Sequence, residues 1–494
     1  MQIERELKFR LPARSASRVW NLLPGTSAVR RRSVESVYYD TPDRRLRSAR
    51  AALRLRHDGR RWLMCFKSER GPATGLAQRS EWEVPAARAA FAPGALPLEA
   101  IAQATRIDLR RMIPRLAPVF TTRFTRQSVE IALPGGAVAE LCVDVGRVVA
   151  GRRAAPIREL ELELRAGDLA AMLEFAEGLI APLGLQLEPL SKAERGYRLV
   201  AAERPAPIKA QQSVLRNDEP VAAAMEAVVR ACLAQIEANA RGVAEDRDPE
   251  YLHQLRVGMR RLRSALRTFN GLGQRKDFRA PAAGLKELMP ILGRARDWDV
   301  FCAGLERRAQ ADEAALLLRR ARARRADARR EARALVGSAR LQHFLLGVLR
   351  WMDETPWRGG RKAARPVAEY ARRALARLER KLVRLGEGLD WADAARRHRL
   401  RIRAKRLRYA CEPFAALYPG GAMGRYLDGL ESLQDILGEL NDIAVGRRLL
   451  RVLRLGRGDA GAAVTRRGFA AREKRLVGRL AAAWRAWRQA MHPW

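Results

Sequence analysis

The sequence predicts an α+β protein of two domains, an antiparallel β-barrel or sandwich followed by an all-α domain. Residues 1–200 alternate apolar and polar side chains in short segments between turn residues, as half-buried strands do. From Pro220 onward, apolar residues recur at helical spacing instead. The chain has 494 residues, which is enough for two large domains.

The strand candidates of the first half follow one another with two interruptions. Turn residues such as Asp58-Gly59 and Pro134-Gly135-Gly136 separate them, which is typical of hairpin connections. Residues 97–113 and 166–182 are expected to be helices instead. The strand candidates read, in order, IERELKFRL, ESVYYD, AALRLRH, RWLMCFKSE, RSEWEVP, TTRFTRQSVEIAL, AELCVDVG and ELELEL. So many short strands favour a barrel or a sandwich.

A proline-rich stretch, RPAPIKAQQ, separates the two kinds of sequence. Prolines before an unstructured polar stretch suit an interdomain linker. We therefore expect a first domain over 1–203, a linker over 204–212 and a helical domain over 213–494.

The helical half contains an internal repeat. HQLRVGMRRLRSALRTF (253–269) resembles HRLRIRAKRLRYACEPF (398–414), and aligning the two leading histidines gives an offset of 398 − 253 = 145. The same offset brings Asp297 onto Asp442. An ungapped register over that span predicts a duplicated helical bundle, with repeats of about 213–357 and 358–494.

The charge balance limits the classes of partner. The 95 Lys and Arg residues against 55 Asp and Glu give a net charge of +40, which attracts polyanions. Nucleic acid, an anionic membrane surface and polyphosphate are therefore admissible partners. Five scattered cysteines fit a reducing compartment, and neither a signal-peptide core nor a membrane-spanning apolar run is present. We expect a soluble, cytoplasmic protein.

Each helical repeat carries a basic stripe beside its apolar stripe. Leu255, Met259 and Leu262 share one helix face, which we expect to face the core. Cations stacked at helical spacing repel one another unless an anion lies between them. Stripe one comprises His253, Arg256, Arg260 and Arg263, and stripe two comprises His398, Arg401, Lys405 and Arg408.

A solvated basic face is the usual explanation of such a charge run, but the matched recurrence favours an anion-binding groove. A metal pair of His253 and His398 lacks nearby Cys or carboxylate partners, so we expect protonated histidines that add to the groove. A structural role of the histidines remains the alternative. Asp297 and Asp442 are expected to orient groove arginines through salt bridges.

The motif His-x-Leu-Arg-Val/Ile-x-x-x-Arg-Leu-Arg, followed by Leu-Gly-x-x-x-Asp and present twice, resembles the CHAD domain (conserved histidine α-helical domain). The resemblance covers roughly 210–494. It implies a helical bundle whose basic central groove, lined by stripes one and two, binds inorganic polyphosphate. The second repeat departs where Asn441 replaces Arg296 and Ala444 replaces Asp299.

Charged residues also alternate along the strand candidates of the first half. Glu4, Glu6 and Lys8 project from one face of the first strand, and Glu161 and Glu163 alternate with leucines in a later one. A solvated outer face explains the first triplet almost as well. If the polar faces line a closed barrel, buried like charges are very costly unless cations and an anion join them. Carboxylates that hold divalent metal beside Lys and Arg that hold phosphates resolve that conflict.

The ordered set Glu4-x-Glu6-x-Lys8, Arg54-x-Arg56, Lys67, Arg79-x-Glu81-x-Glu83, Arg123, Asp144, Glu161-x-Glu163 and Ser191-Lys192 resembles a CYTH domain of the triphosphate tunnel metalloenzymes, over about 1–200. The resemblance implies an antiparallel β-tunnel in which Glu4, Glu6, Glu161 and Glu163 bind Mg²⁺ or Mn²⁺, with Glu4, Glu6 and Lys8 catalytic. It implies triphosphate binding by Lys8, Arg54, Arg56, Lys67, Arg123 and Lys192. Glu81, Glu83 and Asp144 are tunnel residues without an assigned role.

The two resemblances together imply a bacterial inorganic triphosphatase for short-chain polyphosphate, dependent on Mg²⁺ or Mn²⁺. No P-loop motif occurs, which argues against a P-loop nucleotidase. Two alternatives stay open: a polyphosphate-binding protein without turnover, or a tunnel enzyme for thiamine triphosphate, a nucleoside triphosphate or adenylate cyclisation. A nucleic-acid binder fits the charge but lacks a recognition module.

Overall fold

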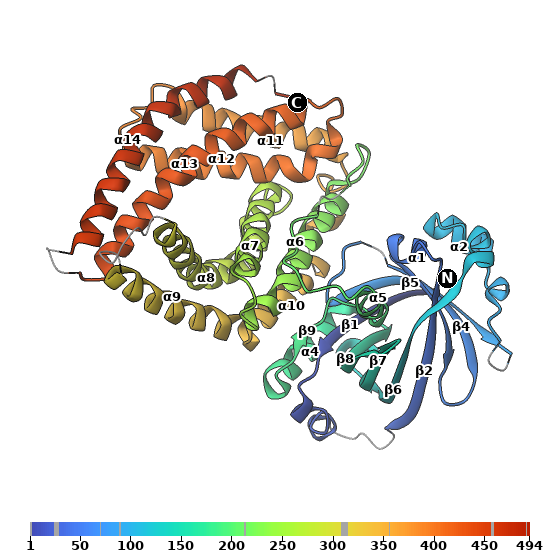
Figure 1. Cartoon of the computed structure of the whole chain (residues 1–494). Helices are drawn as coiled ribbons and strands as arrows, with labels where there is room; N and C mark the ends of the chain where they lie inside the picture. The colour runs from blue at the N-terminus through green and yellow to red at the C-terminus, as the bar shows by residue number, and fades with distance from the viewer. Residues whose placement is uncertain are drawn as a thin grey trace. The chain divides into compact units, whose positions relative to one another are not determined.

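A computed structural model (Figure 1) describes residues 2–23, 29–69, 71–87, 90–211, 214–307, 315–354, 356–455, 459–490 and 492–494. The chain forms two compact units. The first unit comprises residues 1–206 together with 337–354, and the second comprises 207–336 and 355–494. Gln212 and Ser213, at the expected end of the linker, lie outside the described residues.

The first unit is built on one antiparallel sheet in the order β5-β4-β3-β2-β6-β7-β8-β1-β9. An additional pairing of β1 with β5 closes the sheet into a barrel, with β9 added beside β1. The strands are β1 (Gln2–Arg10), β2 (Arg30–Asp40), β3 (Ala51–His57), β4 (Trp62–Glu69), β5 (Leu76–Ala86), β6 (Ala117–Ala132), β7 (Val138–Ala150), β8 (Arg153–Ala166) and β9 (Gln186–Leu187). The expected β-barrel is confirmed.

Helices cover the outer face of the barrel and one end of it. The expected helix over 97–113 is divided into α2 (Leu98–Thr105) and α3 (Leu109–Met112), which pack on the apolar outer residues of β3, β4 and β5. The expected helix over 166–182 is α4 (Leu169–Leu183), which lies beside β8. The remaining helices of this unit are α1 (Arg45–Ser48), α5 (Lys192–Val200) and α10 (Ala339–Asp353).

The second unit is helical and repeats itself at the expected offset. Adding 145 to the bounds of α7 (Pro249–Phe269) gives 394–414, the bounds of α12 (Ala394–Phe414). The helices are α6 (Val221–Ala244), α7, α8 (Arg279–Glu306) and α9 (Ala315–Val336), followed by α11 (Val367–Gly386), α12, α13 (Ala422–Val452) and α14 (Ala460–Gln489). Each helix of the first set matches one of the second, so the duplicated bundle is confirmed.

The apolar stripes of the repeats form the bundle core. Leu255, Met259 and Leu262 are fully buried, as are Leu400 and Leu407 of the second repeat. Helix α7 packs against α6 and α8, while α12 packs against α11, α13 and α7. The basic stripes are thereby carried on two helices that contact each other.

Helix α10 differs from the sequence expectation. Residues 213–494 were expected to form one helical domain, but 337–354 pack with the first unit. The buried residues of α10 lie on one face of the helix, as those of the bundle helices do, so its amphipathic pattern does not distinguish it from them. Among the described residues, no helix has the length and apolar composition needed to cross a membrane.

Candidate functional site

Charged side chains line the inner face of the barrel, and β1 supplies three of them. Glu4, Glu6 and Lys8 are almost fully buried, whereas Ile3 and Arg5 are exposed. The register sets Glu6 opposite Glu163 of β8 and Lys8 opposite Glu161. Side chains directly opposite one another in an antiparallel pair point to the same face. The alternation of β1 therefore places these carboxylates and the lysine inside the closed sheet.

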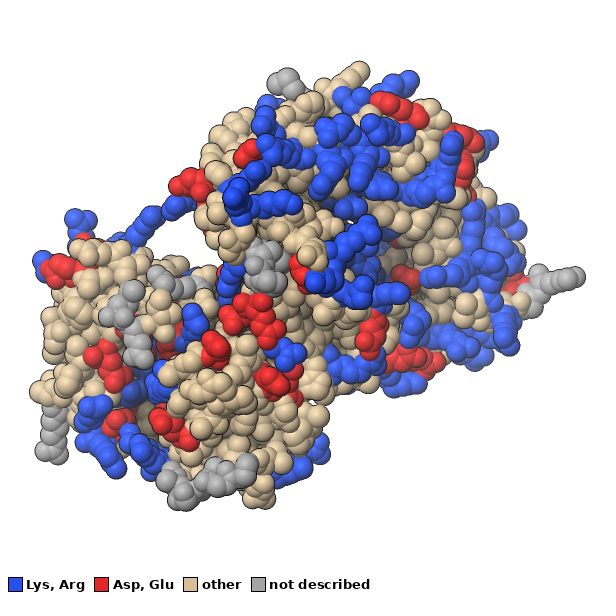
Figure 2. Space-filling model, turned by 180° about the vertical axis from the view of Figure 1, so that it is seen from behind, with Lys and Arg blue, Asp and Glu red and all other residues tan. Residues whose placement is uncertain are grey.

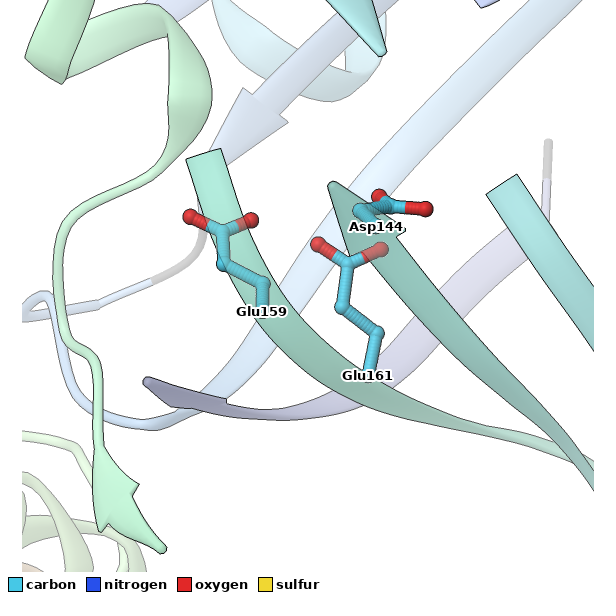
Figure 3. Close-up of side chains that lie close together, drawn as sticks. All are labelled: Asp144, Glu159 and Glu161. Atoms are coloured by element: carbon cyan, nitrogen blue, oxygen red, sulfur yellow. The ribbon is translucent and has the colours of Figure 1, made fainter. Parts of the chain in front are cut away.

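An acidic cluster, defined as Asp144, Glu159 and Glu161, lies at one part of this inner face (Figure 3). Asp144 comes from β7 and the two glutamates from β8, and one carboxylate oxygen of each lies within 4.8 Å of the others. Lys192, at the start of α5, reaches all three: its Nζ is 2.9 Å from Asp144, 2.6 Å from Glu159 and 2.5 Å from Glu161. The Lys192 ammonium therefore offsets the charge that the three carboxylates share.

Arg126 of β6 adds a second cation to the acidic cluster. Its guanidinium donates two hydrogen bonds to Asp144, at 2.8 and 2.6 Å, and one to Glu161 at 2.6 Å. Burial raises the pKa of Glu161, but Lys192 and Arg126 outweigh that effect and hold the pKa well below its usual value. Glu161 is therefore ionised, and all three carboxylates of the cluster are paired with cations of the protein itself.

A separate group of charges lies around Glu4. Lys67 of β4 binds both oxygens of Glu4, at 2.9 and 2.8 Å, and lies 3.1 Å from Glu81. Arg79 of β5 lies 3.4 Å from the other β1 carboxylate, Glu6. Burial raises the pKa of Glu4, and Lys67 and Arg79 bring it below the usual value.

Glu6 and Glu163 are the inner carboxylates whose surroundings compensate them least completely. Glu6 Oε1 is buried and accepts no hydrogen bond from the described residues, and its nearest cation, Lys8 Nζ, is 3.9 Å away. Burial and the nearby Glu4 raise the pKa of Glu163 to about 7, although Glu163 pairs with Arg165. An orphaned carboxylate oxygen beside crowded carboxylates fits a hard divalent cation, which prefers oxygen ligands. Glu6 is thus the carboxylate that best fits a metal. Glu4 and Glu163 lie close enough to join it but would have to exchange Lys67 and Arg165, as Glu161 would have to exchange Lys192 and Arg126.

Two arginines of β3 present unsatisfied donors on the same inner face. Arg54 donates to Tyr38 Oη at 3.2 Å, and Arg56 binds Glu83 at 2.7 Å. The Nε atoms of both arginines are nevertheless buried without a hydrogen-bond partner in the described structure. Buried N–H donors left unpaired are costly, so these positions favour an incoming oxyanion.

Arg123 was expected to line the tunnel, but its side chain does not lie on the inner face of the barrel. Its side chain is 57% exposed and pairs with Glu35 on the outer face. Arg123 and Arg126 differ by an odd number of positions, so the two side chains leave β6 on opposite faces. The inward arginine of this strand is Arg126, and the assignment of Arg123 is corrected accordingly.

Three inward residues received no role from sequence reasoning: Arg79, Arg126 and Glu159. Glu159 shares a face with Glu161 and Glu163 in the ELELEL strand, so the strand period was the available signal. The pairing of Arg126 with Asp144 depends on the register of β6 with β7, which the sequence does not reveal.

In the second unit, stripes one and two lie on α7 and α12, which contact each other. Arg260 of α7 lies 5.8 Å from the ring centre of Tyr409 of α12, and Arg408 lies at the same distance from that ring. The Nε atoms of Arg260 and Arg401 are buried and without partners among the described residues. Figure 2 shows Lys and Arg side chains gathered over much of this unit.

Repulsion among these cations contributes to lowering their pKa values. Burial, followed by Arg401 and Arg260, lowers the pKa of Lys405 to about 7. Burial and Arg260 lower the pKa of Arg256 to about 10. These cations therefore repel one another, and a bound anion would relieve the repulsion. Arg263 and Arg408 are less isolated, since Arg263 donates to Leu285 O and Arg408 pairs with Glu412.

His253 differs from the expectation of a protonated groove residue. Burial and the neighbouring Arg296 lower the pKa of His253 to about 4, so His253 is neutral at pH 7. His398 is exposed. Asp297 binds Arg448 at 2.9 Å, as a salt-bridge partner, although Arg448 belongs to α13 and not to either stripe. Burial raises the pKa of Asp442, while Arg401 and Lys405 act against the rise.

Comparison with known proteins agrees with both family resemblances. The chain matches the CYTH domain over residues 2–197 and the CHAD domain over residues 227–451. The chain joins a CYTH domain to a CHAD domain. The first unit thus holds the CYTH tunnel, and the second holds most of the CHAD bundle.

Two relatives illustrate the match. An inorganic triphosphatase of Haemophilus influenzae is 29% identical over 171 residues, which cover 33% of this chain and 45% of that protein. The chain therefore spans about half the length of this relative. The crystal structure of the CHAD domain from the plant Ricinus communis has a TM-score of 0.53 and 31% identity, and the match covers 58% of this chain and 99% of that domain.

Proposed function

We propose that the CYTH tunnel hydrolyses inorganic triphosphate with a divalent metal, and that the CHAD groove binds polyphosphate. The observation that carries the proposal is the presence of open positions for both signs of charge inside one barrel. Among the described residues, Glu6 Oε1 has no hydrogen-bond partner, and neither have the Nε atoms of Arg54 and Arg56. A metal triphosphate supplies a cation for the carboxylate and phosphate oxygens for the guanidinium groups.

Glu4, Glu6 and Glu163 are the residues that would hold Mg²⁺ or Mn²⁺. When bound, the metal supplies charge neutralisation on the phosphates and polarises a phosphoryl oxygen. Glu161 belongs to this set by resemblance, but its oxygens are engaged by Lys192 and Arg126. We assign Glu161 primarily to holding these two cations in place.

Lys8, Arg54, Arg56, Lys67 and Lys192 would bind the triphosphate, with Arg126 in the place first given to Arg123. Phosphoryl transfer needs mainly positioning and stabilisation of the charge on the transferred group. Rigid ion pairs inside the barrel provide both, because Lys67 and Lys192 are already fixed by two or three carboxylates each. Exclusion of bulk water by the buried walls strengthens every one of these interactions.

The CHAD groove supports binding without chemistry. Arg256, Arg260, Arg401 and Lys405 repel one another and have few carboxylates to offset them. A linear polyanion would satisfy several of these cations at once, at roughly 1.5–3 kcal/mol for each charge-assisted hydrogen bond.

Phosphate release is the test of the CYTH proposal. Purified protein would be assayed with inorganic triphosphate, ATP and thiamine triphosphate in parallel, each with Mg²⁺, with Mn²⁺ and with a chelator. We expect metal-dependent release that is strongest with inorganic triphosphate. Stronger release from ATP or thiamine triphosphate would mean that this compound, and not inorganic triphosphate, is the substrate. No release from any of the three would mean that the tunnel binds its ligand without hydrolysing it.

A further inference from the structure

Helix α10 is set apart from the repeated helices by the unit to which it belongs. In the sequence it lies between α9 and α11, that is, between the helices of the two repeats. The CHAD match includes these residues, yet they belong to the same compact unit as the CYTH tunnel. This helix therefore has a structural task that the repeated helices do not share.

The first contact of α10 is with α4, on the outside of the tunnel. Arg350 lies 3.3 Å from the Glu177 carboxylate, and His343 Nε2 lies 3.2 Å from the Glu177 carbonyl oxygen. Leu345, Leu346 and Leu349 are buried along the helix. This contact holds α10 in place against the barrel.

The second contact is with β9, the short strand beside β1. The side-chain oxygen of Gln342 accepts a hydrogen bond from the Leu187 amide at 3.0 Å, and Gln342 is 3% exposed. Leu187 is pressed against Gly75, where an added Cβ would lie 2.5 Å from its Cδ2 atom. Without Gln342, the Leu187 amide would be a buried donor without a partner.

The segment that begins at β9 leads directly into the tunnel. The Glu188 amide donates to the carbonyl oxygen of Lys8 at 3.0 Å, next to the pairing of β9 with Phe9. Ser191 then caps α5 through its hydroxyl, which accepts from the Glu194 amide. Lys192 follows at once and reaches the acidic cluster.

We propose that Gln342 is a positioning residue for the tunnel, and that α10 braces the 186–191 segment so that Lys8 and Lys192 keep their places. The inference rests on the proposed function for its effect on catalysis. The brace itself is a structural statement that can be measured without turnover.

Three variants in the full chain test the brace. Gln342→Met keeps the length of the side chain but removes the acceptor, and Gln342→Asn is one methylene too short to reach the amide. Gln342→Glu keeps an acceptor oxygen in either protonation state and should restore the wild-type behaviour. Arg350→Met is the matched control, because it breaks the pair with Glu177 on the same helix without touching β9.

Amide hydrogen exchange measures directly whether the segment is held in place. We expect the Leu187 and Glu188 amides to exchange about tenfold faster in Gln342→Met and Gln342→Asn, but not in Gln342→Glu or Arg350→Met. We also expect KM for inorganic triphosphate to rise about fivefold with kcat changed less than twofold, because Lys192 would hold substrate less firmly. A general loss of stability would affect Arg350→Met in the same way.

The outcomes separate this inference from the proposed function. If exchange does not change in the Gln342 variants, the brace is refuted. If exchange rises while KM stays the same, the positioning role is refuted. If the wild-type protein releases no phosphate, the proposed function fails, and calorimetric binding of triphosphate replaces KM as the second measurement.

Discussion

Lys192 Nζ lies 2.5 Å from a carboxylate oxygen of Glu161, at the point where the first residue of α5 meets the inner face of β8. The same ammonium contacts Asp144 and Glu159. Three buried carboxylates thus depend on one lysine and on Arg126 and Arg195 around them. The acidic cluster is a charge-balanced support of the tunnel, and the open carboxylate positions lie at Glu6 and Glu163.

Replacing Lys192 by Met should therefore destabilise the CYTH domain strongly. Removing one partner of a buried ion pair typically costs about 3–5 kcal/mol, because the other charge stays buried without compensation. Lys192→Arg keeps the charge and should recover most of that loss. Urea unfolding of both variants checks this, and equal midpoints for Lys192→Met and wild type would contradict the charge-balance account.

Reversing two groove charges should weaken polyphosphate binding. We expect Arg256→Glu/Arg401→Glu to lower the affinity at least tenfold and to reduce its dependence on salt. The control, Arg403→Glu/Arg406→Glu, makes the same change in net charge on another face of α12. Fluorescence titration with labelled polyphosphate compares them. An equal loss in both variants would mean that net charge, rather than the groove, determines binding.

When no anion is bound, an arginine at the centre of the groove should lower the stability of the folded protein. Arg260 is surrounded by Arg256, Arg401 and Lys405, so Arg260→Met should raise the melting temperature by about 2 °C at low salt while weakening polyphosphate binding. The neighbouring Arg261 is the control: it pairs with Glu412 at 3.2 Å, so Arg261→Met should lower the melting temperature. If thermal unfolding shows that the melting temperatures of both variants change in the same direction, the repulsion is refuted.

Polyphosphate binding should take up a proton near pH 8. Burial, Arg401, Arg260 and Arg408 lower the pKa of Lys405 to about 7, while Asp442 acts in the opposite direction. Because bound phosphates favour the charged lysine, affinity should fall as the pH rises above 7. In the anion-free protein the unfolded chain binds the extra proton, so stability should instead rise between pH 7 and about 10.

Calorimetry in buffers of different ionisation enthalpy measures that proton. Lys405→Arg stays charged throughout this range and should bind polyphosphate without the uptake. Uptake that persists in Lys405→Arg would assign the proton to another group.

Much of this arrangement was predictable because it follows periodicity. Alternation by two places Glu4, Glu6 and Lys8 on one face, and closure of the sheet then decides that this face is buried. The offset between His253 and His398 similarly predicts the paired bundle, because duplicated sequences repeat the same helix bounds.

The remaining features depend on tertiary contacts. Arg123 and Arg126 are equally charged and lie on one strand, so only register shows which of them points inward. Neutral His253 results from burial beside Arg296, a residue far along the chain. The packing of α10 on α4 could not be read from α10 alone, because a single apolar helix face does not show which of the two units it packs against.

The most direct test of the central claim is metal-dependent phosphate release by Glu6→Gln. The substitution keeps the shape of the side chain and removes the charge of the buried carboxylate whose Oε1 has no partner. Glu35→Gln makes the same change on the outer face and is the control. We predict a loss of at least about 100-fold in release from inorganic triphosphate, together with weaker Mn²⁺ binding, while polyphosphate binding is retained. Turnover by Glu6→Gln at the level of Glu35→Gln would contradict the assignment of the metal site.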